Sequence, residues 1–147
     1  MTALPSSRAE LDDLRSIVTR SLKDVSSPNL SADARFVMAY DAARTLSLMV
    51  VRAEGFRPRS VGGHYNTFLA LEAADESFAA LSAYFDGCRI KRNECEYDFA
   101  GGISDTDADG LLETVQKFTV DVETWLENRH KELTRADPPG TDPTRVD

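Results

Sequence analysis

The chain has 147 residues and carries 17 Lys and Arg against 25 Asp and Glu, a formal net charge of −8. This excess of acid excludes a protein that coats nucleic acid through bulk positive charge. With 41% hydrophobic and 29% charged residues, the composition also excludes a wholly disordered or collagen-like chain. It is typical of one soluble globular domain.

The sequence shows no candidate membrane span. Its longest stretch without a charged residue, from Ser60 to Leu71, is too short and too polar to cross a bilayer. Charged residues at positions 8 to 15 interrupt any apolar core of a signal peptide. We therefore expect a cytoplasmic protein with no membrane partner.

Apolar residues at spacings of three and four predict two helices in the first third of the chain. The first carries an apolar stripe from Leu11 to Val25 and is stopped by the polar cluster 26–29. Ser31 is a suitable N-cap for the second, and Gly55 is a suitable residue to end it. A loop without periodicity follows.

A third helical region is predicted to open near His64, and a break at Asp75 makes it either one bent helix or two. Gly101 and Gly102 end that region. Ser104 and the acids after it are suitable caps for a last helix, whose apolar stripe is predicted to extend to Leu133. No strand with convincing alternation is found.

Four or five helices with one apolar face each predict an all-α fold, an up-and-down bundle over residues 1–133. Residues 134–147 are rich in proline and acid and are predicted to be a disordered tail. Cys88 and Cys95, seven residues apart on one helix, are too distant for a disulfide and do not have zinc-site spacing. We expect both to be buried thiols.

Arg92 occupies an unusual position, because it falls in the middle of the apolar arc that holds Phe85 and Cys88. A buried guanidinium is costly without a partner. Arg92 is therefore predicted to meet a carboxylate, a carbonyl, a protein interface or a ligand anion, or to extend its charged end to water.

The segment Arg89-Ile90-Lys91-Arg92-Asn93-Glu94-Cys95-Glu96-Tyr97, with residues 39–44 and the start Gly-Gly-His64, resembles the HEPN superfamily over roughly residues 30 to 130. The resemblance implies a HEPN-like bundle that forms a homodimer and acts in a toxin–antitoxin or phage-defence system. Catalytic members are metal-independent endoribonucleases, and no cofactor is implied. Their motif is an arginine, usually followed by a polar residue, and then a histidine after four to six intervening positions.

In this chain the motif histidine is missing, because Tyr97, Asp98 and Phe99 stand where it would fall. The resemblance therefore assigns a degenerate Arg-x4-Tyr motif. Arg92 would contact RNA phosphate and Asn93 would support it, while Tyr97 and His64 would line the same cleft. A tyrosine is a poor base at neutral pH, so whether the protein cleaves RNA stays open.

Other basic residues are predicted to extend the RNA contact, namely Arg57, Arg59, Arg89 and Lys91, with Arg52 in the same basic set. A local hydrogen bond is the alternative role for His64, and a solvated surface is the alternative for the basic set. The resemblance also implies a nucleotidyltransferase or a small antitoxin as partner, with Tyr97 near the position that such transferases modify.

Two other functions stay open from the sequence alone. One is a non-catalytic helical module that binds a protein, with Arg92 in an interfacial ion pair. The other is a calcium-responsive module, because Asp105, Asp107, Asp109 and Gly110 match the start of a calcium loop. Gln116 replaces the bidentate glutamate of that loop, and the three acids are equally explained as caps of a helix.

Overall fold

The computed structural model describes residues 2–3, 6–57, 66–97 and 102–135. They form an all-α bundle, as predicted. Its helices are α1 (Arg8–Val25), α2 (Ala32–Ala53), α3 (Thr67–Ala74), α4 (Ala79–Tyr97) and α5 (Asp105–Arg129), with the 3₁₀ turns η1 (Glu76–Phe78) and η2 (Lys131–Leu133). None of the described helices combines the length and the apolarity that a membrane span requires.

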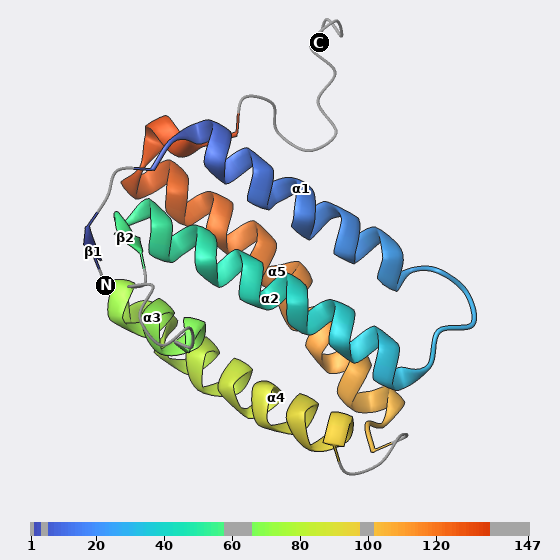
Figure 1. The fold of residues 1–147 in the computed structure, drawn as a ribbon. Coiled ribbons are helices and arrows are strands. Elements are labelled where there is room, and N and C mark those ends of the chain that lie inside the picture. The colour runs from blue at the N-terminus through green and yellow to red at the C-terminus, as the bar shows by residue number, and fades with distance from the viewer. Residues whose placement is uncertain (1, 4–5, 58–65, 98–101, 136–147) are drawn as a thin grey trace, which may run out of the picture.

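Helix α2 is the centre of the bundle (Figure 1). It packs against α1 and α5 on one side and against α3 and α4 on the other. The four long helices alternate in direction, and the short α3 joins α2 to α4. Ala39, Ala42 and Ala43 of α2 are completely buried, and their small side chains let neighbouring helices approach closely.

Most of the residues predicted to begin or end helices do so in the structure. The hydroxyls of Ser31 and Ser104 accept hydrogen bonds from backbone N–H groups in the first turns of α2 and α5. Gly55 follows α2 with a φ of 86°, a conformation that favours glycine. Asp75 ends α3, and its carboxylate accepts the N–H of Ser77 at 2.9 Å. The predicted break there separates two helices.

One predicted helix boundary and the absence of strands differ from the structure. The last helix ends at Arg129, because His130 leaves helical geometry with a φ of −140° and a ψ of 66°. Leu133 is 3% exposed and reaches the core through η2 instead. The strands β1 (Thr2–Ala3) and β2 (Phe56–Arg57) form an antiparallel pair that was not predicted, since two residues are too few to show alternation.

An aromatic cluster fixes α4 against the rest of the bundle. The ring of Phe85 on α4 lies 5.4 Å from that of Phe68 on α3 and 5.3 Å from that of Phe118 on α5. Phe78 packs against Phe118 in an edge-to-face arrangement. These contacts hold one face of α4 in the core and direct its opposite face to the surface.

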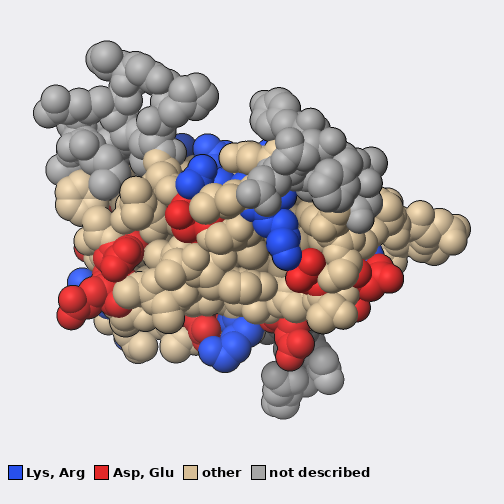
Figure 2. Space-filling model, turned by 90° about the horizontal axis from the view of Figure 1, so that it is seen from below, with Lys and Arg blue, Asp and Glu red and all other residues tan. Residues whose placement is uncertain are grey.

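The surface on the side of α3 and α4 has an uneven distribution of charge. Basic side chains lie mainly in the upper half of Figure 2, with a second group at the lower edge, while acidic side chains lie toward the left and right ends and at the lower edge of the view. A broad uncharged area lies between them. The net acidity of the chain is therefore not spread evenly over this face.

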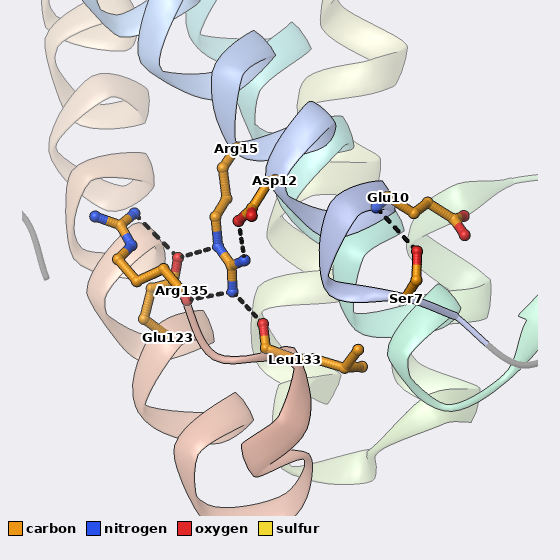
Figure 3. Close-up of polar contacts among 7 residues, drawn as sticks. All are labelled: Ser7, Glu10, Asp12, Arg15, Glu123, Leu133 and Arg135. Atoms are coloured by element: carbon orange, nitrogen blue, oxygen red, sulfur yellow. Dashed lines mark hydrogen bonds and ion pairs between the residues drawn. The ribbon is translucent and has the colours of Figure 1, made fainter. Parts of the chain in front are cut away.

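Arg15 connects the first helix to the last, and its role was not predicted from the sequence (Figure 3). Its Nε and one terminal nitrogen donate to the two carboxylate oxygens of Glu123 at 2.8 and 2.9 Å. It also donates to Asp12 and to the carbonyl of Leu133, both at 2.6 Å. Its side chain is only 8% exposed. Arg15 thus joins α1, α5 and η2 at one buried point.

Arg135 binds Glu123 from the other side, at 3.1 Å. Thr134 and Arg135, which were predicted to begin the tail, therefore lie against the bundle. The remainder of the predicted tail, residues 136–147, lies outside the described residues.

Replacing Arg15 is expected to destabilise the bundle strongly. In Arg15→Ala the carboxylate of Glu123 stays mostly buried after losing its bidentate partner, so we expect a loss of about 3 kcal/mol in the free energy of unfolding. Arg20→Ala, an exposed change on the same helix, should cost less than about 0.5 kcal/mol. Urea unfolding followed by circular dichroism measures both, and equal losses would contradict the role given to Arg15.

A second prediction concerns pH. The indole of Trp125 donates to the Asp75 carboxylate at 2.8 Å, and this bond, the N–H of Ser77 and Arg129 lower the pKa of Asp75. A lowered pKa contributes stability that is present above the ordinary value of about 4 and is lost as pH falls through the folded-state value. Asp75→Asn should therefore destabilise the protein at neutral pH, with a difference from wild type that shrinks in acid. A difference independent of pH in urea unfolding would contradict this.

Candidate functional site

The candidate site is built around a contact between α4 and α2. The guanidinium carbon of Arg92 lies 5.4 Å from the centre of the Tyr40 ring, in cation–π geometry. Tyr40 is only 7% exposed, and its ring meets that of Phe68 edge-on at 5.8 Å. Because the core holds Tyr40 in place, the half-buried Arg92 is placed against a fixed surface.

Two further arginines lie close to the same phenol. Burial raises the pKa of Tyr40, whereas the charges of Arg92, Arg44 and Arg89 act to lower it. Burial likewise raises the pKa of the Asp41 carboxyl, with Arg92 and Arg44 acting in the opposite direction. We call Arg44, Arg89 and Arg92 the arginine cluster. It combines one residue of α2 with two of α4.

The members of the cluster differ in how far they are neutralised. Arg89 donates to Asp86 at 2.8 Å, and Asn66 donates to the same oxygen at 2.7 Å. These two hydrogen bonds lower the pKa of Asp86. Arg44 is exposed and makes no ion pair or hydrogen bond within the described residues. The cluster therefore retains positive charge at the surface.

The structure brings together only some of the predicted site residues. Asn93 is half-buried beside Arg92 on α4. Lys91 points to a different neighbour and forms an ion pair with Asp107 at 3.0 Å. Tyr97 is the last residue of α4, and its side chain lies outside the described part of the structure, as does that of Arg57 at the end of β2. His64 and Arg59 also lie outside it.

The predicted basic set does not form one patch within the described residues. Arg52 lies near the C-terminal end of α2, about 18 Å along the helix axis from Tyr40. It forms an ion pair with Glu10 at 3.3 Å. The reason is the antiparallel packing of α2 and α4, which places the end of α2 away from the end of α4.

The described histidine does not join the arginine cluster. His130 follows α5, and its Nε2 lies 3.2 Å from a carboxylate oxygen of Glu54 at the end of α2. This is the opposite end of α2 from Tyr40. His130 therefore stabilises the junction of two helix ends and is not placed to act with Arg92.

The three acids of the calcium-loop match do not converge. The helix α5 begins at Asp105, so the segment is helical and not a loop. Asp105 and Asp109 both bind Arg35, while Asp107 accepts from the N–H of Ser104 and from Lys91. No group of three potential metal ligands occurs among the described residues. The acids act as helix caps and ion-pair partners.

Cys88 is a buried thiol, as predicted, and burial raises its pKa. It lies at the base of an open groove of about 390 Å³ between α4 and α5, which is lined also by Tyr84, Gly87 and Gly110. A raised pKa disfavours the thiolate, which is the nucleophilic form. The side chain of Cys95 lies outside the described part of the chain.

Comparison with models of known protein families, with curated proteins and with solved structures finds no match. The site is therefore defined by its own geometry. Sequence reasoning identified Arg92 but missed its partners. Arg44 could have been noticed, because it follows Tyr40 by four residues and so shares its side of the predicted helix.

The contact between Tyr40 and Arg92 yields a third prediction. Tyr40→Phe keeps the ring and should change the free energy of unfolding by less than about 0.5 kcal/mol. Tyr40→Leu loses the edge-to-face contact with Phe68 and the cation–π contact, and should cost about 2 kcal/mol. Thermal and urea unfolding of both variants provide the measurement. Equal losses would show that the phenol hydroxyl matters more than the ring.

Proposed function

We propose that this protein is a HEPN-like, RNA-associated protein in which the arginine cluster binds the phosphate backbone of RNA. The observation that carries the proposal is the placement of Arg92 over Tyr40, with Arg44 and Arg89 beside it. The resemblance of residues 89–97 to the HEPN superfamily supports RNA as the ligand, and it places the protein in a toxin–antitoxin or phage-defence system.

The chemistry of the cluster suits a phosphate. A guanidinium offers planar, paired N–H donors that match phosphate oxygens. Stacking on Tyr40 restricts the motion of Arg92, which reduces the conformational entropy lost when a ligand binds. Arg44 adds a charge from a second helix. An extended single strand carries repeated phosphates and would reach both residues at once.

Binding has more support than cleavage. Transfer of the 2′-hydroxyl proton requires a base, and the described histidine lies at the other end of α2. The residues that the sequence offers in place of the motif histidine, His64 and the side chain of Tyr97, lie outside the described residues. If the protein cleaves RNA, Arg92 would stabilise the charge that develops on phosphorus.

We include a second copy of the chain in the proposal, as the resemblance implies. The outward face of α4 supports it, because Tyr84 and Ile90 are 41% and 47% exposed and flank Gly87. The same face also favours the alternative function, a non-catalytic module that binds another protein, and a nucleotidyltransferase or small antitoxin would be such a partner.

Fluorescence anisotropy with labelled single-stranded RNA in EDTA tests the proposal. Arg44→Ala and Arg92→Ala should each weaken binding by roughly tenfold. Each should also reduce the slope of log K against log salt by roughly 0.7, the value for one phosphate contact on a single strand. Arg92→Lys should keep most of the salt dependence. Gel analysis of the same mixtures reports cleavage.

Arg8→Ala is the matched control. It removes an exposed arginine from α1, which lies on the opposite side of α2 from α4. Circular dichroism establishes that each variant is folded. RNA binding that is absent, or that falls equally in Arg8→Ala and Arg44→Ala, would falsify the proposal.

A further inference from the structure

A second basic surface lies on α1, away from the arginine cluster. An open groove of about 590 Å³ runs beside this helix and is lined by Asp12, Arg15, Ser16, Thr19, Arg20, Lys23 and Arg135. Four of these seven residues are basic. The α1 residues follow spacings of three and four and therefore occupy one side of the helix.

The acidic groups at this groove are already engaged. Both carboxylate oxygens of Glu123 accept hydrogen bonds from Arg15, and one of them also accepts from Arg135. Asp12 accepts from Arg15. These contacts neutralise Arg15 and hold Arg135 at the same carboxylate. Arg20 and Lys23 are exposed and form no ion pair within the described residues.

The remaining polar groups of the groove are mostly donors. Nε of Arg135 is buried and has no hydrogen-bond partner in the described part of the chain. Such a buried donor is costly until an acceptor reaches it. The exposed hydroxyls of Ser16 and Thr19 also bond to no described residue, whereas Thr45 and Thr119 donate to the carbonyl four residues earlier.

We infer that this groove binds a small molecule carrying phosphate groups. Guanidinium, ammonium and hydroxyl donors facing one open space require a ligand rich in acceptors and negative charge. Arg20 and Lys23 are one turn apart on α1, about 4.5 Å along its axis, so adjacent phosphates of a diphosphate can meet one each. Arg135 meets the ligand from the opposite wall.

A small apolar pocket adjoins the groove and shares Arg15, Thr19 and Arg135 with it. Val18, Leu22, Leu46 and Met49 line this pocket, which has a volume of about 40 Å³. It is too small for a ring and accepts at most a short alkyl group. The phosphate groups therefore supply most of the recognition.

Pyrophosphate is the probe for this inference. Isothermal titration calorimetry with the whole protein should show saturable binding, and pyrophosphate should raise the Tm more than chloride at the same ionic strength. The double variant Arg20→Ala/Lys23→Ala loses two charge-assisted contacts and should bind roughly 100-fold more weakly. Both changes lie at exposed positions, so the fold should be retained.

Arg8→Ala/Lys117→Ala is the matched control, because it removes the same two residue types from exposed positions on α1 and α5 that line neither proposed site. It should bind pyrophosphate as the wild type does. The inference is overturned if no saturable binding occurs, or if the two double variants bind equally. A third outcome would also overturn it: pyrophosphate binds neither the wild type nor Arg20→Ala/Lys23→Ala, and that double variant loses RNA binding. This result would assign the groove to nucleic acid. Arg92→Ala separates the two sites, since it should weaken RNA binding and leave pyrophosphate binding unchanged.

Discussion

The bidentate pair between Arg15 and Glu123 is the constraint that closes the bundle. It joins the first helix to the last across the side of α2 that faces away from α4. Removing both charges from water is costly, and only a complete set of hydrogen bonds offsets that cost. Arg15 has such a set, because Asp12 and the carbonyl of Leu133 occupy further donors. The pair therefore specifies one register of α1 against α5, since a shift by one residue would leave a buried charge without its partner.

The closure of the bundle also determines what lies at its surface. With Leu133 held against Arg15, the chain after α5 turns back, and Arg135 reaches Glu123. That return brings Arg135 to the same groove as Arg20 and Lys23. A structural ion pair and a surface rich in donors thus depend on the same few residues. Glu123 serves the fold by accepting from two arginines, and in doing so it leaves no carboxylate to neutralise the bases beside it.

Arg15 and Arg92 each interrupt an apolar stripe, and in the structure they have different kinds of partner. Arg15 lies four residues after the fully buried Leu11 and is paired within the core. Arg92 lies four residues after the buried Cys88 and stacks on the ring of Tyr40 near the surface. In the first arrangement carboxylates neutralise the charge of Arg15, whereas in the second the ring of Tyr40 orients the charged guanidinium of Arg92. Periodicity predicted the need for a partner at Arg92, but it did not distinguish a carboxylate from an aromatic ring, and the role of Arg15 was not predicted.

The sequence predicted local features better than contacts between distant residues. The caps at Ser31 and Ser104 and the glycine end of α2 depend on neighbouring residues, and they were found from spacing alone. Leu133 followed the helical spacing, yet a single non-helical residue at His130 placed it in a separate turn. The partners of Arg15 and Arg92 lie on helices distant in sequence, where periodicity carries no information. The same limit applies to Asp105 and Asp109, whose attachment to Arg35 depends on how α2 meets α5.

The net charge of −8 affects how an anion would reach either basic surface. At physiological ionic strength, charges separated by more than about 8 Å are largely screened. The acidic groups elsewhere on the chain therefore slow the approach of a polyanion at low salt but contribute little once contact is made. Within that distance the balance is local, and neither Arg44 in one place nor Arg20 and Lys23 in the other forms an ion pair with an acid among the described residues. An acidic protein can thus favour short, specific contacts with phosphate over the nonspecific coating that a basic protein would show.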